Sequence, residues 1–294
     1  MAVGKTRIGF VGLGIMGTAM TLRLLDRGWP VTVWNLEPER VPPLVAAGAV
    51  AAASPRDVAH ASDIVIMCVL HTDAVRDCVF GAQGVTGGAS PGKVLVDHST
   101  IDPAATREMA VRLKSESGMR WVDAPVSGGP VQSRDGTLTV MAGGDAADIE
   151  AIRPVMADLA ANFTHIGPSG AGQTAKMINQ LIVGSGYVTL AEALTLAEAA
   201  GVDAEHLPQC LAGGHADSSL LRQLYPQMQA RAFDPPRSYA RQLLKDLKAV
   251  SAYAHAMELQ LPMLEAATRR YTDYVEAGNG MQDTASIVNS YRRA

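Results

Sequence analysis

IGFVGLGIMG, residues 8–17, places a short apolar strand directly before three glycines in the spacing Gly12-x-Gly14-x-x-Gly17. An apolar helical stretch, Thr18–Leu25, follows at once. A dinucleotide pyrophosphate needs this order, because the glycines allow a tight turn, a close approach of backbone to phosphate, and close packing of helix on strand. A glycine-rich turn without a cofactor is the alternative, but the strand before it and the helix after it favour a cofactor site. The residues predicted to line this site are Gly12, Leu13, Gly14, Ile15, Met16 and Gly17.

The composition predicts a soluble globular protein of two domains. The chain has 294 residues, of which 48% are hydrophobic and 18% charged, enough to bury a sizeable core. Its formal net charge of -4, without a basic tail, argues against nucleic acid as a partner. No window reaches the ~18 uninterrupted apolar residues of a membrane span. The three cysteines form no CxxC pair and no metal-ligand spacing, which predicts a cytoplasmic location and no metal site.

Apolar runs alternate with helical patterns through the first half of the chain, which is typical of βαβ units. The runs expected to form strands are Ile8–Val11, Val31–Trp34, Ile64–Val69, Val94–Val96, Trp121–Asp123 and Leu138–Ala142. This alternation predicts an α/β fold with a doubly wound, Rossmann-type parallel sheet that helices cover on both faces.

The sequence pattern changes after Gly167. The stretch Ala171–Ala200 reads as one helix of about 45 Å, at 1.5 Å per residue. Further helical stretches without strand signals follow at Ala204–Leu211, Ser218–Arg231, Tyr239–Leu259, Met263–Ala277 and Asp283–Tyr291. We therefore expect a dinucleotide-binding domain over residues 1–167 and an all-helical substrate and oligomerisation domain over residues 168–294. The long apolar helix between them predicts subunit contacts in a homodimer or homotetramer.

Lys176 is the strongest candidate for acid–base chemistry from the residues alone. It shares a helix face with Asn179, three positions on, and its neighbours Ala175, Met177 and Ile178 are uncharged and apolar. Apolar surroundings lower the pKa of a lysine toward the range useful for proton transfer. The alternative is a lysine that extends its charge to solvent from an amphipathic helix.

Small and polar residues follow two of the expected strands. Ser127-Gly128-Gly129 exposes consecutive backbone N–H groups and a hydroxyl, which suits a carboxylate, although such residues also form ordinary turns. Ser99 and Thr100 follow another strand, where parallel sheets bind ligands, with helix capping as the alternative for Ser99. His98 and His215 are weaker candidates for acid–base residues.

Four motifs besides the glycine fingerprint carry a family resemblance. They are Asp97-His-Ser-Thr100, Asp123-Ala-Pro-Val-Ser-Gly-Gly129, Gly172-Gln-Thr-Ala-Lys-Met-Ile-Asn179 and Lys245-Asp246-Leu247. On these motifs the sequence resembles the β-hydroxyacid dehydrogenase family, which includes 3-hydroxyisobutyrate dehydrogenase and tartronate semialdehyde (2-hydroxy-3-oxopropionate) reductase. The resemblance implies an NAD- or NADP-dependent oxidoreductase that interconverts a small 3-hydroxy carboxylate and its aldehyde or ketone by hydride transfer.

The resemblance also implies a role for each motif. Lys176 would be the general acid and base, Asn179 would orient the substrate and the lysine, and Ser127-Gly128-Gly129 would bind the substrate carboxylate. The further residues that would contact the cofactor are Asn35, Leu36, Val69, Leu70, Ser99, Thr100 and Lys245. Two places depart from the common family pattern. Residues 69–72 lack the usual proline and asparagine, and Gln180 replaces a second asparagine, as in tartronate semialdehyde reductases.

Cofactor choice depends on the end of the second expected strand, Trp34-Asn35-Leu36-Glu37. An acidic residue there would hold the ribose 2′-hydroxyl of NAD, and an arginine would accept the 2′-phosphate of NADP. Asn35 is not acidic, but Leu36 replaces the arginine that NADP-preferring relatives often carry, and Glu37 would repel a phosphate. The sequence therefore favours NAD, although Arg40 would compensate if it faced the site.

Two rival functions follow from the same motifs. An imine reductase-like enzyme would share the scaffold, but such relatives usually replace the lysine at the position of Lys176. A catalytically silent cofactor-binding module would also keep the fold, although Lys176, Asn179 and Ser127 together favour chemistry.

Overall fold

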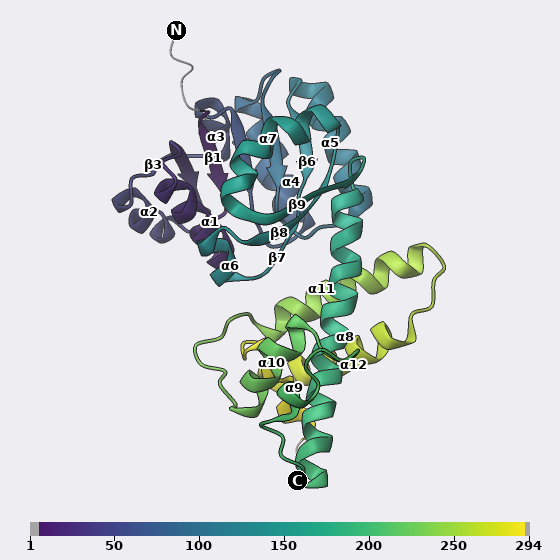
Figure 1. The fold of residues 1–294 in the computed structure, drawn as a ribbon. Helices are drawn as coiled ribbons and strands as arrows, with labels where there is room; N and C mark the ends of the chain where they lie inside the picture. The colour runs from purple at the N-terminus through teal and green to yellow at the C-terminus, as the bar shows by residue number, and fades with distance from the viewer. Residues whose placement is uncertain (1–5, 292–294) are drawn as a thin grey trace. The chain divides into compact units, whose positions relative to one another are not determined.

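The computed structural model describes residues 6–291 and confirms the α/β fold, with a sheet-bearing first unit and a helical second unit (Figure 1). The first compact unit ends at Lys176 and the second begins at Met177. Helix α8 (Ala171–Ala200) therefore begins in the first unit and continues into the second. The expected domain boundary at Gly167 stays a prediction.

Four central parallel strands of the first unit end at a common edge of its sheet. The strands of this unit are β1 Ile8–Val11, β2 Val31–Trp34, β3 Val50–Ala51, β4 Ile64–Met67, β5 Val94–Asp97, β6 Arg120–Asp123, β7 Val126–Ser127, β8 Leu138–Gly143 and β9 Ala160–Gly167. They form one sheet in the order β3-β2-β1-β4-β5-β6-β8-β7, with β9 also paired to β8. Strands β1, β4, β5 and β6 pair in parallel, and their last residues, Val11, Met67, Asp97 and Asp123, are register partners. The loops after these strands therefore leave from the edge where parallel sheets bind ligands.

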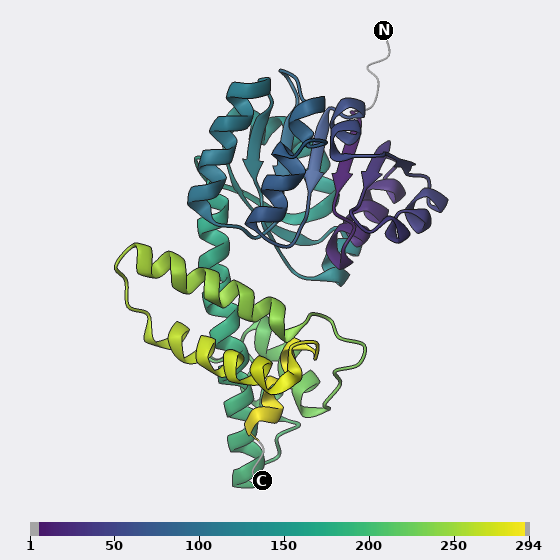
Figure 2. The same cartoon turned by 180° about the vertical axis from the view of Figure 1, so that it is seen from behind.

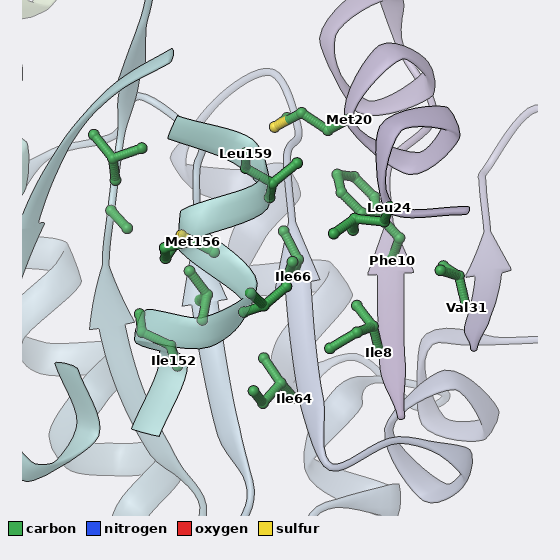
Figure 3. Packing of buried hydrophobic residues seen from close by; sticks show 14 of the residues in the cluster. Ile8, Phe10, Met20, Leu24, Val31, Ile64, Ile66, Ile152, Met156 and Leu159 are labelled. Carbon is green, nitrogen blue, oxygen red and sulfur yellow. The ribbon is translucent and has the colours of Figure 1, made fainter. Parts of the chain in front are cut away.

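Helices cover both faces of this sheet. Since strand side chains alternate between the faces, each face presents apolar residues against which helices pack. The helical segments of the unit are α1 Ile15–Asp26, η1 Pro38–Arg40, α2 Pro42–Ala46, α3 Pro55–Ala61, α4 Thr72–Phe80, η2 Val85–Gly88, α5 Pro103–Ser117, α6 Pro130–Asp135 and α7 Ala146–Leu159. On one face, Ile8, Phe10 and Ile66 pack against α1 and α7 (Figure 3). On the other face, Val65 and Leu95 pack against α3, α4 and α5, the side of the sheet seen in Figure 2.

The second unit is helical in its described residues. After α8 it contains α9 Leu207–Cys210, α10 Ser219–Gln229, α11 Ala240–Ala256, α12 Pro262–Tyr274, the π-helical turn η3 Val275–Asn279 and the 3-10 helix η4 Thr284–Tyr291. Buried apolar side chains from α8, α10, α11, α12 and η4 form its core, in which Tyr225 and Tyr271 are the largest fully buried ones. The Tyr271 hydroxyl donates to the backbone oxygen of Thr284 at 2.9 Å, which ties η4 to α12.

The structure corrects several expectations about individual elements. The sheet is mixed, because β8 pairs antiparallel with β6 and β7. Strand β9 was not expected from the sequence, since most of its side chains are exposed and it carries no apolar run. The predicted helix over Ala204–Leu211 is shorter, Leu207–Cys210. Pro208 lies in its first turn, because proline has no backbone N–H to donate to a preceding turn of helix. The last predicted helix is a 3-10 helix.

Helix α8 is the one helix within residues 6–291 whose length and mean hydropathy, 1.2 over its most apolar window, would allow it to cross a membrane. The core helix of a soluble protein meets the same criteria. Here Met177, Ala191 and Leu194 of α8 are buried in the core of the helical unit.

Candidate functional site

The three fingerprint glycines have distinct physical reasons to be glycine. Gly12 has a φ of 96°, and a side chain on it would overlap the backbone oxygen of Cys68. A side chain on Gly17 would overlap the backbone oxygen of Gly12, so Gly17 allows the close packing of α1 on the loop. Gly14 has an ordinary φ of -67° and nothing within 4 Å of an added Cβ. The space above Gly14 is therefore open at the N-terminus of α1, where a phosphate is stabilised.

Asn35 connects the glycine loop to the end of β2. Its Oδ1 accepts the Leu13 N–H at 2.7 Å, and its Nδ2 donates to the Glu37 carboxylate at 2.7 Å. Arg40 Nε lies 3.7 Å from the same carboxylate, whereas the Leu36 side chain is exposed. Leu13 itself is fully buried, its N–H is bonded to Asn35 and its backbone oxygen accepts the Thr18 hydroxyl at 3.0 Å. The amide of Asn35 thus holds both the glycine loop and Glu37.

Ser99 connects the loops that follow β4 and β5. Its Oγ accepts the Val69 N–H at 3.0 Å, and its N–H donates to Asp97 Oδ1 at 2.9 Å. Ser99 is buried and does not cap α5, whose N-cap is Asp102. Its hydroxyl therefore fixes the loop geometry at the edge of the sheet, and the half-buried Thr100 follows it directly.

Ser127-Gly128-Gly129 forms the turn from β7 into α6. Gly128 and Gly129 have φ values of 138° and 90°, a region that side chains disfavour. Ser127 is half-buried and pairs with Thr139 of β8. A turn of this conformation without side chains on two residues gives a ligand access to the backbone, as carboxylate binding requires.

Asp97 and Asp123 are buried carboxyl groups that end neighbouring strands. Burial raises the pKa of Asp97 to about 7 and the pKa of Asp123 to about 6. Asp123 Oδ1 accepts the Gly170 N–H at 2.8 Å, and Oδ2 accepts the Gln173 N–H at 3.0 Å. Asp123 therefore holds the backbone at the start of α8, a function that the sequence analysis missed. Its bonded partners lie 47 and 50 positions away in the chain.

Lys176 lies on α8 one turn after Gln173 and is 7% exposed. This low exposure argues against the alternative of a lysine whose side chain extends into solvent. Asn179 follows one turn later on the same helix, so it shares a face with Lys176.

A polar chain in the helical unit begins at Asn179. Its Nδ2 donates to Gln180 Oε1 at 2.8 Å, and Gln180 Nε2 donates to Asp246 Oδ2 at 2.6 Å. Lys245 Nζ lies 3.0 Å from the other oxygen of Asp246. The structure thus brings Asn179 and the sequence-predicted Lys245 into one network through Gln180 and Asp246.

The two histidines stay weak candidates for acid–base residues. His98 is buried, and its Nδ1 lies 2.6 Å from the Ala124 backbone oxygen. Burial lowers its pKa to about 4, so its imidazole is neutral at neutral pH. His215 lies in an exposed loop before α10. Among residues 6–291, no group of three or more His, Cys, Asp and Glu side chains could hold a metal ion.

The chain matches two family models that together span nearly its whole length. Residues 7–167 match the NAD binding domain of 6-phosphogluconate dehydrogenase, and residues 170–291 match the NAD-binding domain of NADP-dependent 3-hydroxyisobutyrate dehydrogenase. The chain is 37% identical to 2-hydroxy-3-oxopropionate reductase of Escherichia coli K12, over 97% of this chain and 96% of that protein.

Two solved structures resemble the protein along its length. A crystal structure of 3-hydroxyisobutyrate dehydrogenase from Salmonella typhimurium is 32% identical, with a TM-score of 0.87 over 97% of this chain and 100% of that one. The 3-hydroxyisobutyrate dehydrogenase of Mycobacterium tuberculosis with L-serine is 27% identical, with a TM-score of 0.88 over 98% and 100% of the chains. The geometry of the glycine loop and the family model that matches this part of the chain therefore both indicate an NAD(P) site.

The contrast between Gly14 and Gly17 gives a test of this site. Gly14→Ala meets no atom of the protein, so we expect a melting temperature equal to or slightly above that of the wild type. Its methyl group would fill the space for the phosphates, so the Kd for NADH should rise at least about tenfold. Gly17→Ala should lose both stability and binding, because its methyl group overlaps the loop.

Thermal unfolding and fluorescence titration with NADH measure these effects. Wild-type affinity in Gly14→Ala would show that the cofactor phosphates do not approach this loop.

Proposed function

This chain belongs to the β-hydroxyacid dehydrogenase family, and on that premise we propose that Lys176 is its general acid and base in the interconversion of a small 3-hydroxy carboxylate and its aldehyde or ketone. The observation that carries the proposal is the burial of Lys176 one turn after Gln173, whose side chain bonds to the loop after β5 at the cofactor edge of the sheet. A lysine buried at that place is shielded from bulk solvent, which suits a group that exchanges a proton with a substrate.

Each residue has a defined task in this mechanism. The nicotinamide of the bound cofactor supplies hydride acceptance in oxidation and hydride donation in reduction. The turn Ser127-Gly128-Gly129 would hold the substrate carboxylate through backbone N–H groups and a hydroxyl. Lys176 would take the hydroxyl proton during oxidation and return a proton to the carbonyl oxygen during reduction. Asn179 would orient the substrate and the lysine, with its amide held by Gln180 at 2.8 Å.

The substrate class follows from the relatives. The similar proteins are named for 2-hydroxy-3-oxopropionate, 3-hydroxyisobutyrate and 2-(hydroxymethyl)glutarate, each a small hydroxy or oxo carboxylate. We propose a substrate of the same kind here. The retained Lys176 argues against the imine reductase-like alternative, and it also argues against a catalytically silent module.

Replacing Lys176 tests the mechanism. Lys176→Ala should lower kcat about 10²–10⁴-fold, the usual contribution of a positioned acid–base group, with the Kd for NADH little changed. Lys248→Ala removes an exposed lysine from α11 and serves as the matched control.

Initial rates with 3-hydroxyisobutyrate, glycerate, serine, threonate and phenylserine give the measurement. Unchanged turnover in Lys176→Ala would contradict the assignment. A flat panel in the wild type, with NADH still bound, would favour the silent module or imine reduction.

We further propose that NAD is the preferred cofactor. The Glu37 carboxylate is held at the end of β2 by Asn35, and the exposed Leu36 offers no positive charge there. A fixed carboxylate at this place favours a ribose 2′-hydroxyl and repels a 2′-phosphate. Arg40 pairs with Glu37 itself at 3.7 Å, so its charge is partly committed.

Neutralising Glu37 tests the cofactor preference. Glu37→Gln keeps an oxygen that can accept from Asn35 and removes the charge. The ratio of kcat/KM for NADP to that for NAD should rise about fivefold, the effect of one charge about 4 Å from a phosphate in water. Glu39→Gln, at the exposed neighbouring carboxylate, is the control. A wild-type preference for NADP would contradict the proposal outright.

We also propose a homodimer or homotetramer with a cytoplasmic location. Helix α8 leaves Ile178, Ile182 and Leu196 exposed on one face, with Ile182 65% and Leu196 70% exposed. An apolar stripe of this kind favours a second subunit as its cover. Cys68, Cys78 and Cys210 form no disulfide, as a reducing compartment favours, and the net charge of -4 argues against nucleic acid. We take α8 as a core helix of a soluble protein rather than a membrane span.

A charge on the α8 stripe tests the assembly. Ile182→Glu should shift the mass measured by size-exclusion chromatography with light scattering toward the monomer, because an unpaired carboxylate in an apolar interface is costly. Val111→Glu places the same charge on an exposed valine of α5 and should leave the mass unchanged. A wild-type monomer at micromolar concentration would refute the proposal.

A further inference from the structure

The amide of Gln173 joins the first turn of α8 to the loop after β5. Gln173 is fully buried. Its Oε1 accepts the Ile101 N–H at 3.1 Å, and its Nε2 donates to the Ser99 backbone oxygen at 2.8 Å. One side chain thus satisfies a donor and an acceptor of a loop more than 70 residues earlier in the chain.

The backbone of the same turn is held from a second direction. Asp123 accepts the N–H groups of Gly170 and Gln173, and a side chain on Gly172 would lie 2.9 Å from its Oδ2. The turn therefore sits closely over the end of β6. Since a helix is rigid over one turn, fixing residue 173 also fixes Lys176, whose Cα lies about 4.5 Å further along the axis.

The loop to which Gln173 bonds lies at the edge of the sheet where the parallel strands end. Ser99 also binds the Val69 N–H through its hydroxyl and Asp97 through its N–H. A continuous set of hydrogen bonds therefore runs from the loops after β4 and β5, through Gln173, to the turn that carries Lys176. All of these residues lie in the first compact unit.

We propose that Gln173 is a positioning residue that sets Lys176 relative to the loop of Ser99 and Ile101. The proposal rests on the proposed function of Lys176. Its physical basis is that misplacing a catalytic group by about 1 Å can cost about 10²-fold in rate, whereas cofactor affinity depends chiefly on the phosphate loop. Loss of Gln173 should therefore lower kcat with little effect on NADH binding.

A double-mutant cycle tests the proposal. Gln173→Met keeps the length of the side chain and removes both hydrogen bonds. We expect kcat to fall about 10- to 100-fold, with the Kd for NADH within about threefold of wild type. In a Lys176→Ala background the same substitution should have little further effect, because Gln173 acts through the lysine. Gln223→Met, at an exposed glutamine of α10, is the control.

A second variant gives a readout that a purely structural role would not produce. In Gln173→Glu, only a protonated carboxyl can both accept from Ile101 and donate to Ser99. The kcat of this variant relative to wild type should therefore rise as the pH falls through the pKa of the introduced carboxyl. This variant decides the question if Gln173→Met does not fold.

The outcomes separate the two proposals. Full turnover in Lys176→Ala would refute the function proposed for the lysine. An inactive Lys176→Ala together with an unchanged kcat in Gln173→Met would refute only the role of Gln173. Equal fold-losses from Gln173→Met in the two backgrounds, or a pH-independent ratio for Gln173→Glu, would also refute that role.

Discussion

The in-register parallel pairing of β1, β4, β5 and β6 is the constraint on which the site depends. Because Val11, Met67, Asp97 and Asp123 are register partners, the backbone leaves all four strands at the same level. The glycine loop, the loop of Ser99 and the anchor of α8 consequently lie along one edge without any long insertion. A slip of one residue in any of these pairs would turn a buried strand residue to the opposite face and misalign the loop behind it.

Local signals in the sequence were sufficient for much of this arrangement. The glycine spacing, the apolar runs and the long helix each depend on neighbouring residues, and the structure bears out the elements predicted from them. The reversal of β8 and the edge strand β9 depend on partners distant in sequence, which periodicity cannot show. Because most side chains of β9 are exposed, its sequence also lacks the apolar pattern by which a strand is predicted.

The candidate site divides in the same way. Residue types and motifs pointed to Lys176, Asn179 and the turn at Ser127. They did not show which groups Asn35, Asp123 and Gln173 bond to, because all of those hydrogen bonds except the two from Asn35 to Glu37 span at least 22 positions. Asn35 illustrates the difference: the sequence placed it at the cofactor, and its amide holds Leu13 and Glu37. Buried polar side chains of this kind take their roles from the fold rather than from their neighbours.

The first turn of α8 belongs structurally to the sheet-bearing unit although it opens the helix that builds the other one. Gly170 and Gln173 complete the hydrogen bonding of Asp123, a buried carboxylate that would otherwise lose those donors. Recombination between relatives is therefore constrained at this point. A chimera joined after Gly167 would combine Asp123 from one parent with the first turn of α8 from another. A junction after Lys176 keeps Asp123, Gln173 and Lys176 from the same parent.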